Sequence, residues 1–462
     1  MLSPLLPFPF YLCCIAVIFL AWNAWQGREE GWGIPMLAVL GTVGVWYLGD
    51  VLYNDYAGYV AMFGEEPLNA AWWEVLLFFI SLGILVPVMN RRINRDLAGR
   101  GSHVIQMMRD RAVDTDNFQN QVTLISRALL IPWVLLMGLG LVRTNFDFIG
   151  IFFPYLGAKI DPWGRGRLGG GIDAIYALAG YIQLMLTALW GVVFALSKRP
   201  STFTLAGVVY FLSVPFYVFD RTRSYMLAVL LPGFMALVTL RMTGGLIVRL
   251  IVIVVSFMAM ESWMKFVIEN RSNTTITEAF KKRSTQTVQE TKKKHLGFNM
   301  YQELGYINYF IANGTYKVNW GTRYFAEIVN PIPRVLWPGK PEIGTDYAIA
   351  RGMSSALAAG QSTIAATIST GMIGQGVVNF GGFLGPITTA LLMAIWVAIL
   401  ARQDLMGNDI GHLLLYAIGL VLTYNLGRDI TLLILYPFVF GWLLLSLMNR
   451  KKKKLQSQFH EA

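Results

Sequence analysis

Apolar runs long enough to cross a lipid bilayer constrain this chain more than any other feature of its sequence. A spanning helix needs about 20 predominantly apolar residues, and about eleven runs approach that length. They lie near 5–25, 34–53, 70–89, 128–143, 172–196, 202–219, 225–240, 246–263, 383–401, 411–426 and 430–448. Hydrophobic residues make up 55% of the 462 residues and charged residues only 14%, which is typical of membrane proteins. The sequence therefore predicts an all-α polytopic membrane protein.

The positive charge of the chain is better explained by membrane topology than by nucleic-acid binding. The formal net charge is +11, but the cations gather in short clusters beside the apolar runs. One side of the predicted membrane receives the arginine-rich loop 91–127, Lys198, Arg199, Arg241, Arg402 and the basic tail 450–454. The opposite loop, 54–69, contains no Lys or Arg. Because basic loops remain in the cytoplasm, we expect the C-terminus inside and the N-terminus outside.

The N-terminal run, the cysteines and the histidines point to neither a cleaved signal nor a metal site. The first cation is Arg28, so residues 1–25 predict a retained span. Cys13 and Cys14 are adjacent and build neither a disulfide framework nor a metal site. The four histidines, His103, His295, His412 and His460, are scattered along the chain. No Walker loop, dinucleotide-binding pattern or nucleophile elbow is present, so we expect no metal and no cofactor.

The predicted spans divide the chain into three parts. Residues 1–263 contain eight spans joined by short loops, and residues 383–462 contain three spans and a basic cytoplasmic tail. Between spans 8 and 9, residues 264–382 form one large outer loop. A loop of this length favours an enzyme lid or an acceptor platform.

Within the large loop, the sequence predicts several different segments. Residues 270–295 are polar and charged, and predict a solvated stretch. Residues 298–328 predict an amphipathic helix that lies on the membrane. The small-residue run 363–378 either re-enters the membrane or packs on the helix bundle.

Residues 330–341 form a stiff segment in the same loop. They contain four prolines, each of which fixes φ and removes an amide donor, so the segment is neither a spanning helix nor a central strand. It is either a rigid linker or a rigid mount that presents Arg334, Trp337 and Lys340.

Arginines on the outward loops form the candidate site. They are Arg165, Arg167, Arg221, Arg223, Arg334 and Arg428, joined by Lys340. The arginine fork fits phosphate oxygens in pairs, so several such residues around one cavity would hold a pyrophosphate. The alternative is that each pairs with a nearby acid, such as Asp220 or Asp429. Aromatic residues of these loops supply faces for sugar rings, although interfacial belts use the same residues: Trp163, Trp320, Tyr324 and Trp337.

Several of these pieces resemble one family. Residues 330–341 resemble the I-P-R-x-L-W-P-x-K-P segment of the Wzy-type oligosaccharide repeat unit polymerases, which include the polymerases of O-antigen and enterobacterial common antigen. Residues 222–224 resemble the family's G-(T/S)-R turn, and residues 374–381 resemble its G-E-x-Y-x-N-F-G stretch. Arg428 matches an arginine between the last two helices, and Arg167 resembles one in an earlier periplasmic loop.

The chain departs from the family pattern at two places. Gln375 stands where many members carry Glu, which argues against a general base at that position. Asp220 and Arg221 replace the glycines that usually precede the G-(T/S)-R turn. Either Arg221 or Arg223 could therefore be the functional cation, and we favour Arg223.

The resemblance implies a GT-C-like helical fold and a metal-independent glycosyltransferase. Such an enzyme polymerises undecaprenyl-pyrophosphate-linked repeat units into a surface polysaccharide on the periplasmic face of the bacterial inner membrane. It places the N-terminus in the periplasm and the C-terminus in the cytoplasm. The implied catalytic residues are Arg223 and Arg428, and the implied substrate-binding residues are Arg334, Lys340, Trp337, Arg167, Arg221 and Arg165. The implied partners are a lipid-linked donor and acceptor, the bilayer and a chain-length regulator.

Two other functions stay open from the sequence. An O-antigen-ligase-like glycosyltransferase would share the arginines and use another acceptor. A flippase for lipid-linked sugars belongs to another class, and the short loops and inverted repeats usual in flippases are not evident. The base that activates the acceptor hydroxyl is not singled out by spacing among Asp220, Glu303, Asp429 and His295.

Overall fold

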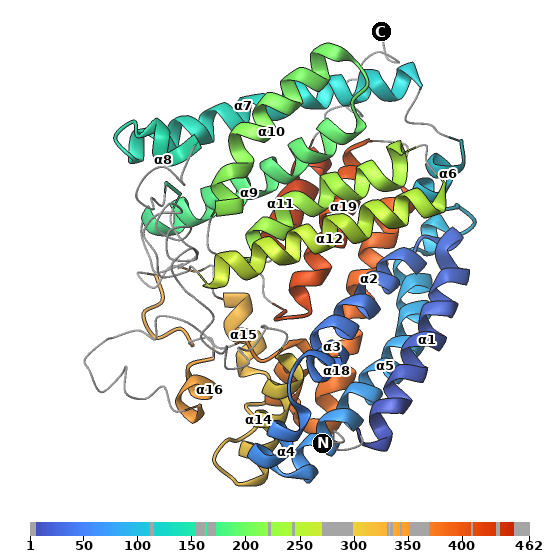
Figure 1. Ribbon diagram of the computed structural model, residues 1–462, viewed down its shortest axis with the longest axis vertical. Helices are drawn as coiled ribbons and strands as arrows, with labels where there is room; N and C mark the ends of the chain where they lie inside the picture. The colour runs from blue at the N-terminus through green and yellow to red at the C-terminus, as the bar shows by residue number, and fades with distance from the viewer. Residues whose placement is uncertain are drawn as a thin grey trace, which may run out of the picture. The chain divides into compact units, whose positions relative to one another are not determined.

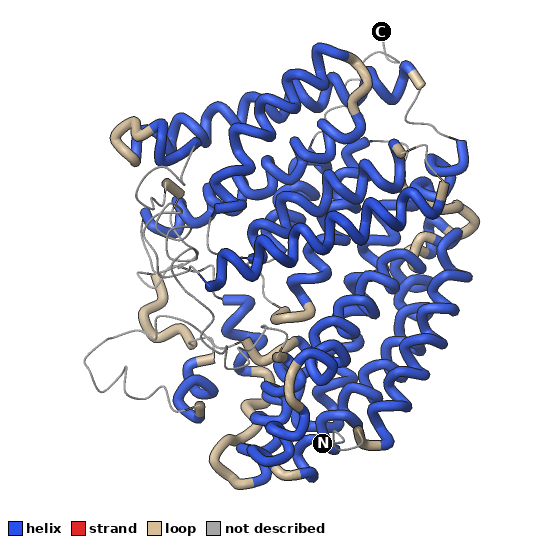
Figure 2. Tube along the Cα trace, in the orientation of Figure 1, coloured by secondary structure: helices blue, strands red, loops and turns tan. Residues whose placement is uncertain are grey.

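The fold is all-helical over the residues that the structure describes, as the sequence predicts (Figures 1 and 2). This computed structural model describes residues 6–110, 115–152, 162–163, 172–219, 223–242, 245–269, 299–329, 332, 336–341, 344–351, 369–407, 410–430 and 435–447. No strand occurs within these ranges.

Seven of the described helices are long and apolar enough to cross a membrane. They are Phe8–Glu30, Gly33–Leu52, Glu65–Ile93, Asp116–Arg143, Leu178–Leu196, Pro200–Phe219 and Met372–Leu405. Shorter apolar helices lie at Tyr225–Arg241, Ile247–Met260, Ile410–Leu426 and Leu435–Leu447. Each apolar run predicted from the sequence coincides with one of these helices. The prediction of a membrane-embedded helical protein is therefore confirmed, while the number of spans remains a prediction.

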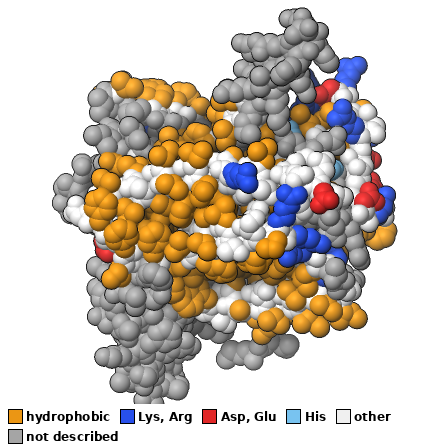
Figure 3. Space-filling model, turned by 90° about the horizontal axis from the view of Figure 1, so that it is seen from above, with side chains coloured by type: hydrophobic (Ala, Val, Ile, Leu, Met, Phe, Trp, Pro, Cys, Tyr) orange, Lys and Arg blue, Asp and Glu red, His pale blue; other side chains and the backbone are white. Residues whose placement is uncertain are grey.

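Apolar side chains cover the outside of these helices as well as the inside. In α7 (Asp116–Arg143), Ile131 and Leu135 are 66% and 68% exposed, and in α10 (Pro200–Phe219) Phe211 is 62% exposed. Figure 3 shows a face on which hydrophobic side chains predominate and charged side chains gather toward one edge. A surface of this kind faces lipid rather than water.

The described chain forms two compact units. Unit 1 comprises Met1–Ser102, Lys293–Met406 and Leu422–Ile434, and unit 2 comprises His103–Lys292, Gly407–Val421 and Leu435–Ala462. Helix α19 (Ile410–Leu426) contributes residues to both units. The units differ from the three sequence segments predicted above, because parts of the large loop pack with the first helices.

In unit 1, α5 and α18 lie side by side at the centre (Figure 1). These two helices are α5 (Glu65–Ile93) and α18 (Met372–Leu405). Around them lie α1 (Phe8–Gln26), α2 (Gly33–Val43), a π-helical turn (Gly44–Leu48), α3 (Gly49–Tyr53), α4 (Tyr56–Phe63), α14 (Met300–Ala312), α15 (Thr322–Val329) and α16 (Thr345–Ala350). The fully buried rings of Trp72 and Tyr301 stack at 4.1 Å between α5 and α14.

The prediction of one membrane-surface helix over 298–328 differs from the structure. The segment forms two helices, α14 and α15, separated by a turn, and most of α14 is buried. Asp50 accepts hydrogen bonds from the amide of Gln302 at 2.9 Å and from the hydroxyl of Tyr59 at 2.8 Å. The side-chain amide of Asn308 donates to the carboxyl of Glu74 at 2.9 Å. These buried polar contacts hold α14 inside the unit, and a sequence window cannot show them.

Helix α18 is a hairpin rather than a single rod. Its backbone leaves the helical region at Gly381 (φ 77°), which a residue with a side chain rarely adopts. Residues before and after Gly381 are in contact: the hydroxyl of Thr389 donates to the carbonyl of Met372 at 3.2 Å, and a Cβ placed on Gly376 would lie 2.4 Å from the carbonyl oxygen of Gly385. Residues so far apart in a straight helix can meet only if the chain reverses.

We call residues 372–380 the short arm and residues 382–405 the long arm of the α18 hairpin. The long arm corresponds to the predicted span 383–401. The short arm includes the end of the small-residue run 363–378, and its side chains Met372, Ile373 and Val377 are fully buried. The described part of that run therefore packs on the bundle, and the close approach of two glycines allows it to do so.

In unit 2, α9 (Ile172–Leu196) packs against α7, α10 and α11 (Arg223–Ala236). The other elements are α6 (His103–Asp110), α8 (Phe148–Phe152), a π-helical turn (Leu237–Arg241) and α12 (Leu246–Glu269). A Cβ on Gly233 would lie 2.8 Å from the carbonyl of Gly191, so only glycine lets α11 approach α9 this closely. The indole of Trp133 donates to Ser213 at 2.8 Å and joins α7 to α10.

Candidate functional site

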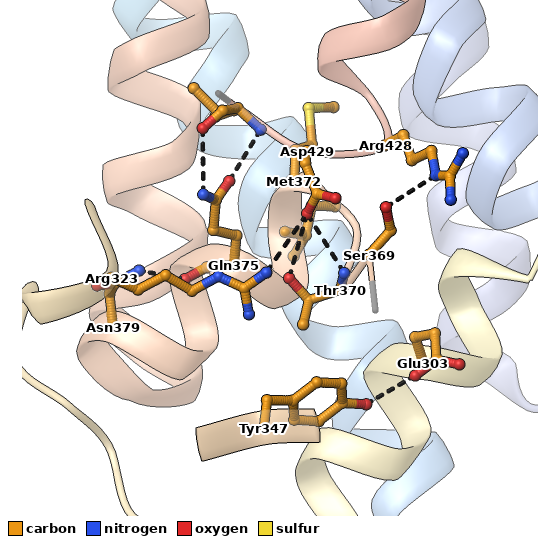
Figure 4. Close-up of polar contacts among 12 residues, drawn as sticks. Glu303, Arg323, Tyr347, Ser369, Thr370, Met372, Gln375, Asn379, Arg428 and Asp429 are labelled. Carbon is orange, nitrogen blue, oxygen red and sulfur yellow. Dashed lines mark hydrogen bonds and ion pairs between the residues drawn. The ribbon is translucent and has the colours of Figure 1, made fainter. Parts of the chain in front are cut away.

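The candidate site lies in unit 1, where three separate stretches meet (Figure 4). They are α15, the residues that lead into the short arm of α18, and the turn 427–430 that follows α19. The start of α15 is fixed to the hairpin because the amide of Asn319 donates to the carbonyl of Val378 at 3.0 Å. The amide of Tyr324 also donates to the side-chain oxygen of Asn379, at 3.3 Å. The amide of Met372 donates to the carbonyl of Gly427 at 3.2 Å and fixes the third stretch.

Arg323 reaches from α15 to Asp429. Its Nη2 lies 3.8 Å from Oδ1 of Asp429, and that oxygen also accepts from the amide of Thr370 at 3.3 Å and from its hydroxyl at 3.4 Å. Arg323 is only 4% exposed, yet within the described structure its Nε and Nη1 have no hydrogen-bond partner. Buried polar groups are normally bonded, so these two donors are available to an oxyanion.

Arg428 adds a second guanidinium to the same place. Its Nε donates to the hydroxyl of Ser369 at 2.8 Å, and Ser369 directly precedes Thr370. In Figure 4, Arg323 and Arg428 lie on either side of the Asp429 carboxylate. Arg428 is exposed, whereas Arg323 is buried. The structure thus joins one arginine predicted from the sequence to one that the prediction did not include.

Gln375 fixes the turn that carries Arg428 and Asp429. Its side-chain amide donates to the carbonyl of Ile430 at 3.1 Å, and its side-chain oxygen accepts from the amide of Ile430 at 2.9 Å. Gln375 is fully buried. A carboxylate could accept but not donate, so glutamine is the residue that satisfies both backbone groups. At this position the side chain braces the site and does not act as a base.

Glu327 places a second carboxyl beside Arg323. It lies one helical turn after Arg323 on the same buried face of α15, is 4% exposed, and its Oε2 has no partner in the described part of the chain. Burial raises the pKa of Glu327 to about 8, and the charge of Asp429 also raises it, whereas Arg323 lowers it. Burial likewise raises the pKa of Asp429, again against the effect of Arg323. Two carboxyls that share one buried arginine can hold a proton at neutral pH.

A second arginine–carboxylate cluster in unit 1 is more closely bonded, although Nε of Arg351 has no partner in the described structure. Arg351 donates to Glu303 at 3.0 Å, and the hydroxyl of Tyr347 donates to the other oxygen of Glu303 at 2.7 Å. The guanidinium of Arg351 also lies 3.4 Å from the ring centre of Tyr306. Glu303, one of the candidate bases, therefore acts as an anchor between α14 and α16 in this structure.

The predicted residues of the proline-rich segment lie near α15. The Lys340 side chain is 4% exposed and its Nζ donates to the carbonyl of Ile332 at 2.7 Å, which braces the segment across its own turn. Trp337 is 37% exposed and packs edge-to-face on Phe325 of α15, with ring centres 6.3 Å apart. Arg334 lies outside the described residues.

The predicted arginines of unit 2 are outside the described structure or at its limit. Arg165, Arg167 and Arg221 lie outside the described residues, as do the candidate bases Asp220 and His295. Arg223 is the first residue of α11, and its side chain is outside the description. These predictions remain as the sequence left them.

The pair Arg323 and Glu327 was missed in the sequence, although it left a signal there. The two charges are four residues apart, so a helix places them on one face. Phe325 and Ile328 then fall on the other face. A short helix with both charges on one face and apolar residues on the other is expected to meet a polar partner at its charged face.

No group of three or more His, Cys, Asp or Glu residues in the described part of the chain could hold a metal ion. Comparison with known proteins gives no further guide, because no family model, no curated protein and no solved structure matches this chain. The function is therefore argued from the geometry of the site.

Proposed function

We propose that this protein is a metal-independent glycosyltransferase that polymerises undecaprenyl-pyrophosphate-linked oligosaccharide repeat units. The observation that carries the proposal is the pair Arg323 and Arg428 around Asp429, with two donors of a buried arginine left unbonded. The predicted topology puts these residues on the outer side of the membrane. A GT-C-like fold, a location in the bacterial inner membrane, and a periplasmic N-terminus with a cytoplasmic C-terminus belong to the same proposal.

The arginines are suited to the leaving group of this reaction. A bond forms between the acceptor hydroxyl oxygen and the anomeric carbon of the donor, while the bond from that carbon to the pyrophosphate breaks. The pyrophosphate leaves with the electron pair and gains negative charge. Fixed guanidinium donors that face the growing charge lower the barrier. Arg323 supplies two such donors in a buried setting, where each is worth more than it would be in water.

The acceptor hydroxyl must lose its proton as the new bond forms. Of the candidate bases within the described residues, Glu303 is held by Tyr347 and Arg351, whereas Asp429 lies at the arginine pair. We assign the proton-accepting role to Asp429, with Glu327 as the neighbouring carboxyl that shares Arg323. Arg223 keeps its proposed catalytic role beside Arg428. The proposed substrate-binding residues are Arg334, Lys340, Trp337, Arg167, Arg221 and Arg165. A chain-length regulator is the expected protein partner.

The proposal is tested with purified protein in proteoliposomes that contain lipid-linked repeat units. We expect a ladder of products that differ by one repeat unit. Arg323→Ala and Arg428→Ala should each remove the ladder while leaving insertion intact. Arg402→Ala is the matched control, because Arg402 forms a partly exposed pair with Asp96 at 2.7 Å in the same unit.

Two outcomes of this assay would contradict the proposal. Transfer of one glycan to an acceptor other than a repeat unit, with no ladder, would identify a ligase-like enzyme that uses the same arginines. Translocation of the lipid-linked units without any glycosidic bond formation would identify a transporter.

A further inference from the structure

Helix α15 has its polar and apolar faces exchanged relative to a helix on a water-exposed surface. Arg323, Ala326 and Glu327 are buried, with exposures of 4%, 1% and 4%. On the opposite face, Phe325 is 49% and Ile328 63% exposed. A surface helix in water shows the reverse arrangement, with the charges outside and the large apolar residues inside.

Exposed apolar side chains also precede and follow α15 in the chain, and one of them, Trp337, packs on the helix. Trp320 is 74% exposed, Leu336 76%, and Trp337 lies edge-to-face on Phe325. We define the outer face of α15 by its exposed large apolar residues, which are Trp320, Phe325, Ile328, Ile332, Leu336 and Trp337. None of these residues carries a charge. Soluble proteins rarely leave so many large apolar side chains together in water.

The outer face continues onto a membrane helix of the same unit. A Cβ on Gly321 would lie 3.3 Å from the ring of Phe380, and the rings of Tyr324 and Phe380 are 6.2 Å apart. Just beyond Phe380 the α18 hairpin turns into its long arm, where Phe383 is 70% exposed. The start of α15 therefore contacts the turn of the α18 hairpin, and α18 is long and apolar enough to span the bilayer.

We propose that the outer face of α15 lies in the bilayer interface and contacts lipid. Lipid fits the face because it is apolar, rich in Trp and Phe, and continuous with the exposed surface of the long arm. α15 is then a one-helix wall, with lipid on one side and the Arg323–Glu327 face on the other. An anion bound to Arg323 would sit at the depth of the headgroups, within reach of a molecule that is itself anchored in the membrane. This inference does not depend on glycosyl transfer.

Spin labels in proteoliposomes test the placement directly. In full-length protein with Cys13 and Cys14 replaced by Ala, single cysteines are introduced as Ile328→Cys and Leu336→Cys and then labelled. Thr315→Cys is the control, because Thr315 is exposed in the polar turn after α14. We expect labels at 328 and 336 to collide several-fold more with oxygen, which partitions into lipid, than with a water-soluble nickel chelate. The label at 315 should show the opposite preference.

Preferential collision with the nickel chelate at 328 and 336 would overturn the inference, and so would protection from both reagents, which would mean that protein covers the face. A second measurement avoids labelling. Lipids brominated near the headgroup should quench a smaller fraction of the tryptophan fluorescence in Trp320→Phe than in the unaltered protein. Trp163→Phe, at a side chain 3% exposed in unit 2, should not lower that fraction. An unchanged fraction in Trp320→Phe would also contradict the proposal.

Discussion

Two arginine–carboxylate clusters of unit 1 use the same chemistry for different ends. In the first, Arg351 and Glu303 lie 3.0 Å apart, Tyr347 donates to the second carboxylate oxygen, and the ring of Tyr306 covers the guanidinium. In the second, Arg323 and Asp429 lie 3.8 Å apart and two nitrogens of the buried guanidinium have no partner in the described structure.

The clusters differ in degree: Arg351 leaves one nitrogen unbonded beside a close ion pair, whereas Arg323 leaves two beside a long one. We propose that the first is a structural ion pair and the second binds a ligand. The Arg351 pair is close, and Arg351 is partly exposed at 22% of its side-chain surface, so its geometry is explained by folding alone. Arg323 has only 3% of its side-chain surface exposed. Its burial costs desolvation free energy that the contact with Asp429 offsets only in part. A guanidinium buried under those conditions is better explained by the proposed binding role than by stability.

The largest effect expected is on turnover at Arg323. Arg323→Ala should lower the rate of glycosyl transfer by a factor on the order of 10²–10³, the usual loss for one well-placed donor to a developing oxyanion. The thermal midpoint should fall only slightly, because Nε and Nη1 have no described partner to lose and Nη2 loses only its 3.8 Å contact with Asp429. Steady-state kinetics with lipid-linked repeat units, together with thermal unfolding in detergent, would measure both. A loss of stability with unchanged turnover would show that Arg323 forms a structural ion pair, like Arg351, and does not bind the substrate.

A change of pH should reveal the contribution of Glu327, which lies beside Arg323, to the stability of the protein. The folded protein holds a proton on Glu327 up to a pKa of about 8, whereas the ordinary value is 4.5. The folded state thus binds more protons than the unfolded state between these values, and the free energy of unfolding should fall as the pH rises through that window. Glu327→Gln should remove the fall, with a gain at pH 8 on the order of 1.4 kcal/mol for each pKa unit. Parallel stability curves for the two proteins from pH 5 to 8 would refute this.

The Arg351–Glu303 cluster should respond to loss of its arginine in the opposite sense to the Arg323–Asp429 cluster. Arg351→Ala leaves Glu303 without its cation and should lower the free energy of unfolding by about 1–3 kcal/mol, with turnover of the remaining folded protein little changed. Denaturant titration and initial rates, corrected for the folded fraction, would test it. A specific loss of turnover at full stability would remove the contrast between the clusters.

The smallest effect is expected at Gln375, which fixes the turn that carries Arg428 and Asp429. Gln375→Glu retains the acceptor for the Ile430 amide but loses the donor to its carbonyl. We expect a loss of about 1 kcal/mol in stability and a lower rate, since the turn with Arg428 and Asp429 is less firmly held. Gln375→Leu is the comparison that loses both bonds. Higher activity in Gln375→Glu than in the unaltered protein would show that a carboxylate at this position serves as a base.

The membrane helices could be predicted from the sequence because each coincides with a local apolar run. The site is less local. Arg428 could be found because it interrupts two apolar runs, whereas Arg323 lies in a mixed aromatic stretch that resembles a membrane-surface helix. Which face of that stretch turns inward depends on Asp429 and Thr370, which follow far along the chain. The break between α14 and α15 likewise depends on the buried contacts of Asp50 and Asn308 with other elements.

The α18 hairpin has a consequence for the order of assembly during synthesis. Its short arm precedes its long arm in the chain, and several of its contacts are made to later residues: Met372 with Thr389 and Gly427, and Gln375 with Ile430. The arginine pair cannot come together until the chain through residue 430 has been made and α19 has found its place. The protein would therefore insert most of its membrane helices as an inactive precursor and gain its anion site only in the last steps of biogenesis.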